Sequence, residues 1–307
     1  MRREKPGSQP FAGSPNWRRK RLPSPFYAPR KRFGQNFLEP AWVDKLIRQI
    51  SPRDDDTFLE IGPGRGALTH PLAERAGRVL AFEIDHDLAA ALTASAAAHL
   101  TVVDGDFLDV TADRLRPLLS ADERLRPLRV AGNLPYNIAS PILFKLAELF
   151  ADGLPLADAH VMLQREVADR LIAQPATSEY GVLTVLIGHI AEVAKVLSLP
   201  PGAFRPAPKV NSAVVRLRFH PPDPPVQRGQ VFTDLVRAVF THRRKTLANA
   251  LLAFKERGRE SLPGREFFPA ALGRAGIDGA RRPETLTIAE FARMADAVAD
   301  VPLSGPA

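Results

Sequence analysis

The stretch FLEIGPGRGALT, residues 58–69, decides the fold. An apolar run over 57–61 stops at three glycines, at positions 62, 64 and 66, and a helical pattern follows. Glycines between a strand and a helix let the backbone approach a ligand, with helix N–H groups beyond it. Their G-x-G-x-G spacing differs from the G-x-G-x-x-G expected around a dinucleotide pyrophosphate. The stretch therefore predicts a site at a strand end for a ligand that need not contain a pyrophosphate group.

Short apolar runs alternate with helical patterns on both sides of this stretch. We expect strands over 57–61, 79–84, 100–103, 128–131 and 160–163. We expect helices over 41–50, 67–75, 87–98, 141–150 and 166–172. Two further strands, 192–199 and 212–219, are expected to be antiparallel at one edge. Short apolar strands separated by helices indicate an α/β fold, with a parallel sheet covered on both faces.

The character of the chain changes at a proline-rich linker, HPPDPPVQRG (220–229). Helical patterns follow it over 231–240, 246–254, 270–275 and 288–298. We therefore divide the chain into a basic tail (1–30), a ligand-binding α/β domain (31–220) and a small all-helical C-terminal domain (221–307).

Composition excludes several kinds of site. The 307 residues contain no cysteine, which removes disulfides, zinc–thiolate sites, iron–sulfur clusters and a cysteine nucleophile. The seven histidines are scattered without metal-ligand spacing, so we expect no metal. No apolar run reaches the length of a membrane span, and no signal-peptide pattern is present. We expect a cytoplasmic protein without a membrane partner.

The net charge of +8 is concentrated in the tail. Residues 1–32 contain ten Lys and Arg against one Glu, while the rest of the chain is nearly neutral. A proline-rich polycation of this kind should be disordered when free and suits a polyanion. A solubility tail and a transit peptide are the alternatives; six prolines argue against the amphipathic helix of a transit peptide.

Acidic residues follow the next two expected strands. Glu83 lies 21 positions beyond Gly62 and is suited to hold ribose hydroxyls. Asp106 could accept a hydrogen bond from an adenine amino group, and Phe107 could pack on the ring. Any one of these acids alone could be a helix cap or a solvated loop residue. Together they predict an adenosine ligand without pyrophosphate, which indicates S-adenosylmethionine.

The motif NLPY, residues 133–136, follows the fourth expected strand. An adenine amino nitrogen is a poor nucleophile because its lone pair is delocalised into the ring. The Asn133 side-chain oxygen and the Leu134 carbonyl could accept its two hydrogens, which favours a pyramidal nitrogen. Pro135 holds Leu134 extended, and Tyr136 can stack on a flipped-out base. Catalysis would then consist of positioning and electrostatics.

The motifs taken in order resemble the ribosomal RNA adenine N6,N6-dimethyltransferase family from about residue 31 onward. The segments that carry the resemblance are KRFGQNFL (31–38), EIGPGRGALT (60–69), EID (83–85), GDFL (105–108), NLPYNIASP (133–141), LQREVADRL (163–171), FRPAPKVNSAVVRL (204–217), RRKTLANAL (243–251) and RRPETLTIAEF (281–291). Ala139 departs from the serine usual in the family, Asn211 departs from the common aspartate, and the tail is longer.

The resemblance implies a class I (Rossmann-like) methyltransferase sheet with a helical C-terminal domain. It also implies dimethylation of two adjacent adenosines in a loop near the 3′ end of small-subunit (16S) rRNA during subunit biogenesis. The partner would be a 30S subunit precursor, and we expect a monomer. Carried over by motif, the cofactor contacts are Asn36, Leu38, Gly62, Glu83, Asp106 and Asn133.

Two further roles are assigned by the same resemblance. Phe204 would join Asn133, Leu134 and Tyr136 as a second aromatic wall of the adenine pocket; the alternative is that it is a core residue. Arg243, Arg244 and Lys245, expected on a helix, would contact RNA phosphates, against the alternative of a solvated helix face.

Three other functions are considered. One is a 23S rRNA methyltransferase of the macrolide-resistance type, which shares the chemistry. Another is a non-catalytic assembly or transcription factor, which the intact NLPY motif disfavours. A NAD enzyme is disfavoured by the glycine spacing.

Overall fold

The structure is a computed structural model and describes residues 36–253 and 262–301. The basic tail, 1–30, lies outside the described residues. No helix among the residues described is both long enough and apolar enough to span a membrane.

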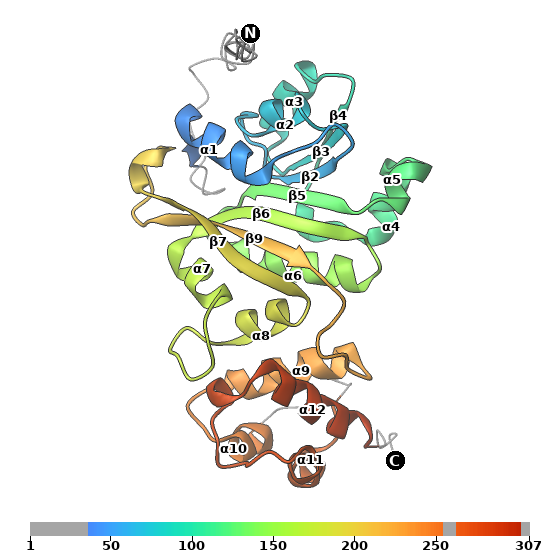
Figure 1. The fold of residues 1–307 in the computed structure, drawn as a ribbon, viewed down its shortest axis with the longest axis vertical. Coiled ribbons are helices and arrows are strands. Elements are labelled where there is room, and N and C mark those ends of the chain that lie inside the picture. Colours follow the sequence, from blue (N-terminus) through green and yellow to red (C-terminus); the bar gives the residue numbers. More distant parts are fainter. Residues whose placement is uncertain (1–35, 254–261, 302–307) are drawn as a thin grey trace, which may run out of the picture.

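A seven-stranded sheet runs through the upper and middle parts of the molecule (Figure 1). Its strand order is β4-β3-β2-β5-β6-β9-β7. The strands are β2 (Thr57–Ile61), β3 (Arg78–Glu83), β4 (Leu100–Asp104), β5 (Leu128–Asn133), β6 (Leu156–Gln164), β7 (Ala191–Leu199) and β9 (Ser212–Phe219). The first five in chain order, β2 to β6, are parallel to one another, as expected from their apolar runs. This confirms the α/β class.

The chain reverses its direction of sheet building between β2 and β5. It moves outward from β2 through β3 to β4, then returns to place β5 on the other side of β2. In open α/β sheets a ligand crevice forms beyond the carboxyl ends of the strands at such a switch point. The topology therefore predicts a ligand site at the carboxyl ends of β2, β3, β4 and β5.

The strands expected at the edge form a β9–β7 pair. β9 pairs antiparallel with both β6 and β7, so it lies inside the sheet while β7 forms the edge. Because both contacts of β9 are antiparallel, β7 runs in the same direction as β6. Only β9 is reversed.

Alternate side chains of the buried strands face two separate apolar cores. In β2, Phe58 packs into the core beneath α1, while Leu59 packs into the core beneath α6. The helices of this part are α1 (Pro40–Ile50), α2 (Thr69–Ala73), α3 (His86–Ala94), α4 (Ala112–Leu115), α5 (Ala121–Leu125), α6 (Ala139–Ala151), α7 (Arg165–Leu171) and α8 (Val182–Gly188). Both faces of the sheet are therefore covered.

Helices make up the C-terminal part, drawn in orange and red at the lower end of Figure 1. They are α9 (Gly229–Thr241), α10 (Leu247–Leu252), α11 (Phe268–Ala275) and α12 (Ile288–Ala299). Their apolar faces form a third core, which also takes Tyr180, Val185 and Leu186 from α8 and the loop before it. Leu183 and Ile187 of the same helix face the sheet core. One helix is thus shared by two cores.

Several elements differ from expectation. The helix expected over 67–75 is confined to α2, because the glycine segment continues as turns to residue 68. The segments 107–125 and 182–188 contain helices that no clear periodicity indicated. A two-residue strand, β1 (Phe37–Leu38), pairs antiparallel with β8 (Phe204–Arg205).

Candidate active site

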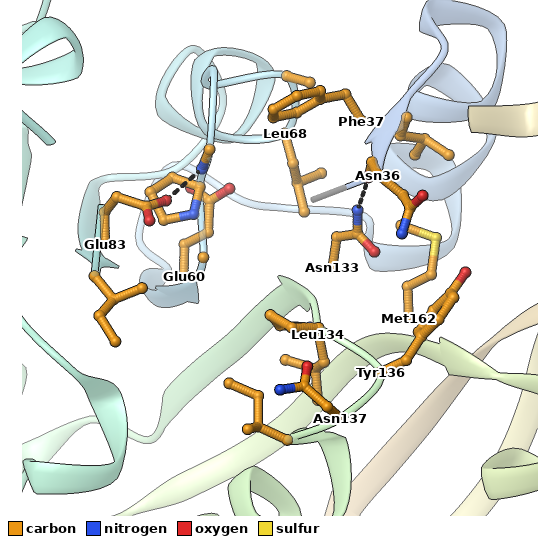
Figure 2. A pocket seen from close by; sticks show the side chains of 18 of the residues that line it. Asn36, Phe37, Glu60, Leu68, Glu83, Asn133, Leu134, Tyr136, Asn137 and Met162 are labelled. Carbon is orange, nitrogen blue, oxygen red and sulfur yellow. Dashed lines mark hydrogen bonds between the residues drawn. The ribbon is translucent and has the colours of Figure 1, made fainter. Parts of the chain in front are cut away.

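A cavity of about 310 Å³ opens at the switch point of the sheet. It is lined from every strand end that the topology indicated, and from β1. The sequence-predicted residues among its lining are Asn36, Leu38, Gly62, Glu83, Asp106, Asn133, Leu134 and Tyr136. Figure 2 shows the acids Glu60 and Glu83 on one side of this cavity, with Asn133 and Tyr136 on the other.

The glycine loop after β2 is held by the acid after β3. Gly64 adopts a left-handed φ of 58° and donates its N–H to Glu83 Oε2 at 2.8 Å. A side chain at Gly64 would also come within 3.1 Å of the Phe37 ring. Glycine at this position thus allows both the turn and the close approach of β1.

Glu83 both holds the glycine loop and lines the cavity. Its other oxygen, Oε1, accepts the N–H of Asp85 at 2.9 Å. Burial raises the pKa of Glu83 above its usual value, while the N–H groups of Asp85 and Gly64 act in the opposite direction. Each carboxylate oxygen has a further lone pair, so the group can still accept hydrogen bonds from a ligand in the cavity.

Asp106 both caps a short helix and lines the cavity. Its Oδ1 accepts the N–H of Leu108 at 2.9 Å, which is the helix-cap alternative. It also lines the cavity, so its second oxygen is available for a ligand. The neighbouring Phe107 does not line the cavity: it is buried in the sheet core and meets Phe82 edge to face. The expectation that Phe107 packs on a ligand ring is not met.

Asn133 has a defined orientation. Its Nδ2 donates to the backbone oxygen of Asn36 at 2.6 Å (Figure 2). Since the amide nitrogen is used by a carbonyl acceptor, the side-chain oxygen lies at the opposite edge of the planar amide group. The side-chain oxygen of Asn133 is therefore left as an acceptor at the cavity.

The rest of the NLPY turn is tied to the strands beside it. Leu134 donates its N–H to the carbonyl of Met162 at 3.0 Å, and Met162 lines the cavity next to Tyr136. The Tyr136 hydroxyl lies 2.6 Å from Ser212 Oγ. Burial raises the pKa of Tyr136, so the phenol stays neutral.

Phe204 does not line the cavity in this structure. Its side chain is fully buried in the core beneath α1, and it is not among the residues that line the cavity. Its β8 strand position opposite Leu38 of β1 accounts for this burial. Phe204 is thus a core residue in this structure, and its role as an aromatic wall of the adenine pocket stays a prediction.

The basic triplet after α9 lies on a turn and not on a helix. The turn occupies residues 242–245, between the end of α9 and the start of α10. Arg244 and Lys245 are exposed, whereas Arg243 donates through Nη2 to the carbonyl of Thr177 at 3.0 Å. Arg243 thus joins the C-terminal helices to the loop before α8, whereas Arg244 and Lys245 are exposed to solvent.

Glu60 is the cavity residue that sequence reasoning missed. It is 1% exposed, and among the residues described no donor reaches its Oε2. Burial, with the charge of Glu83 nearby, raises the pKa of Glu60 to about 8. The available signal was an acid inside the apolar run FLEI, where a strand core would otherwise be uncharged.

Comparison with known proteins agrees with this geometry. The family model described as "Ribosomal RNA adenine dimethylase" matches residues 28–299. The chain belongs to the ribosomal RNA adenine dimethylase family. It is an S-adenosylmethionine-dependent rRNA adenine dimethyltransferase with a class I methyltransferase fold.

Relatives of this family match over nearly their whole length. "Ribosomal RNA small subunit methyltransferase A" of Cronobacter sakazakii is 40% identical over 90% of this chain and 95% of its own. The protein of the same name from Acinetobacter baylyi is 42% identical over 87% and 91%.

Two solved structures share the fold. A dimethyladenosine transferase from Plasmodium falciparum is 23% identical with a TM-score of 0.65, over 84% of this chain and 95% of its own. The 23S rRNA methyltransferase ErmE is 28% identical with a TM-score of 0.58, over 86% and 99%.

Proposed function

We propose that this enzyme dimethylates the N6 groups of two adjacent adenosines in a loop near the 3′ end of small-subunit rRNA. Its substrate would be a 30S subunit precursor, and it would act as a monomer in the cytoplasm. The single observation that carries the chemistry is the oriented amide of Asn133, whose nitrogen is used by the Asn36 carbonyl. The small-subunit substrate is supported by relatives of that name at 40–42% identity, against 28% for ErmE.

The donor set of the cavity fits S-adenosylmethionine. A buried carboxyl group with an oxygen that no described donor reaches, Glu60 Oε2, is suited to a ligand that brings positive charge into a dry site. Glu83 would hold the ribose hydroxyls, Asp106 the adenine amino group, and Asn36, Leu38 and Gly62 would enclose the rest. When bound, the cofactor supplies an electrophilic methyl group.

The NLPY turn would prepare the target adenine. The Asn133 side-chain oxygen and the Leu134 carbonyl accept the two N6 hydrogens, which concentrates the nitrogen lone pair away from the ring. Tyr136 stacks on the extruded base and fixes its plane. No strong base is needed, since the nitrogen becomes acidic once it is alkylated. The protein contributes position and preorganised dipoles.

The exposed pair Arg244 and Lys245 would contact phosphates of the subunit, because these cations lie on an exposed turn. Arg243 is better explained as a link between the C-terminal helices and the loop at Thr177. The basic tail would add affinity without selectivity, since a polycation neutralises phosphates irrespective of the bases.

One assay tests this function. Transfer of labelled methyl groups should be measured with undermethylated small subunits, large subunits and free rRNA as acceptors. We expect dimethyladenosine at two adjacent sites in the small subunit alone. Transfer to large subunits would favour the macrolide-resistance type of enzyme, and no transfer to any acceptor would favour a non-catalytic assembly factor.

A further inference from the structure

The hydroxyl group of Tyr136 contacts Ser212, a residue that does not line the cavity. Its oxygen lies 2.6 Å from the Oγ of Ser212, at the first residue of β9. Ser212 is 1% exposed, so this contact is withdrawn from water on its Ser212 side. A side-chain hydrogen bond in a dry setting is stronger than one at a wet surface.

Ser212 is itself held rigidly from both sides. It pairs in register with Gln164 of β6 and with Leu199 of β7. The residue before it, Asn211, accepts the N–H of Arg165 through its carbonyl at 3.0 Å. The Oγ therefore belongs to a fixed point of the sheet, whereas Tyr136 belongs to a turn between β5 and α6.

A stacking ring on a turn needs such a fixed point. The Tyr136 ring is partly exposed at the cavity, and rotation about its two side-chain torsions would tilt its face away from a bound base. The hydroxyl contact holds the far end of the ring and restricts the first torsion, which would otherwise swing the whole ring away. Because the phenol stays neutral, the bond persists whichever of the two hydroxyls donates.

We propose that Ser212 is a positioning residue that holds the Tyr136 ring in place beside the target adenine. The inference rests on the proposed function, in which Tyr136 stacks on that base. It also gives a role to the serine in the segment FRPAPKVNSAVVRL, which has no contact with the cavity through its own side chain. Ser212 acts through Tyr136 alone.

The test is a double-mutant cycle on the full-length enzyme with undermethylated small subunits. Ser212→Ala and Tyr136→Phe should each lower kcat about 3- to 10-fold, the range of one neutral hydrogen bond. KM for the subunit and the cofactor Kd should stay near wild type. The double variant should be no slower than either single variant, because both remove the same bond.

Three further variants separate the outcomes. Ser212→Thr, which keeps the hydroxyl, should restore kcat, and Ser198→Ala on the neighbouring β7 strand should leave it unchanged. Multiplied effects in the double variant, or a Ser212→Ala enzyme with wild-type kcat, would overturn the inference. Tyr136→Ala tests the proposed stacking independently. If Tyr136→Ala has full activity, the stacking role of Tyr136 is rejected. If Tyr136→Ala loses activity while Ser212→Ala does not, only the positioning role of Ser212 is rejected.

Discussion

Replacement of Glu60 by glutamine should make the protein more stable at neutral pH. The carboxyl group is 1% exposed, and no donor among the described residues reaches its Oε2. Burial raises its pKa to about 8 from an ordinary value of 4.5. In the folded state without ligand the group is therefore mostly protonated at pH 7, and it ionises readily in the unfolded chain.

The sign and size of the effect follow from proton linkage. Between pH 4.5 and about 8 the folded state binds more protons at Glu60 than the unfolded state does. The free energy of unfolding therefore falls as pH rises through this window, by up to about 1.4 kcal/mol per pH unit. At pH 7 the accumulated cost is about 3 kcal/mol, which glutamine avoids because it cannot ionise. Below pH 4.5 the two proteins should be equally stable.

Urea unfolding of wild type and Glu60→Gln at pH 4.5, 6, 7 and 8 measures this difference directly. Glu192→Gln, at an exposed position of β7, serves as the matched control and should leave the pH dependence unchanged. Parallel stability curves for wild type and Glu60→Gln would refute the reasoning, since they would mean that Glu60 titrates alike in both states. The same variant should bind S-adenosylmethionine more weakly, because the wild-type acid can release its proton to match a cationic ligand.

Four other variants test the remaining assignments. Asn133→Ala should lower kcat about 100-fold in the subunit assay and keep subunit affinity, because a preorganised dipole acts mainly in the transition state. Arg244→Ala with Lys245→Ala should weaken subunit binding and flatten its salt dependence, whereas Arg243→Ala should instead lower the midpoint of thermal unfolding through loss of the Thr177 contact. Deletion of residues 1–30 should reduce the slope of log affinity against log salt by roughly 0.7–0.9 per phosphate engaged, with kcat unchanged; equal slopes would exclude a tail–RNA contact.

Much of the sheet was predictable because its signals are local. The β2 run ends at glycines, and the strands β3 to β6 each end at a polar residue. Hydrophobic period and these strand-end residues together indicate the order of elements. The convergence of Glu83, Asp106 and Asn133 then follows from the parallel arrangement. No such local signal exists for β1 and β8, which are two residues each and pair across most of the methyltransferase part.

Aromatic side chains were the least predictable part of the site. Phe107 and Phe204 stand beside polar, motif-bearing residues, yet both are buried in cores. Composition cannot decide between a core and a cavity wall, because either environment favours a large flat ring. Tyr136, in contrast, lines the cavity, and its hydroxyl has a partner at Ser212, a contact made by residues 76 positions apart.

The sharing of α8 between two cores bears on how this protein could be divided. A fragment that stops at residue 220 would uncover Val185 and Leu186, and one that starts at 221 would lose the Tyr180 ring from its interior. Either cut leaves an exposed apolar patch that invites aggregation. Exchange of C-terminal regions between relatives at residue 220 should therefore succeed only when Tyr180, Val185 and Leu186 of one parent match the helical core of the other.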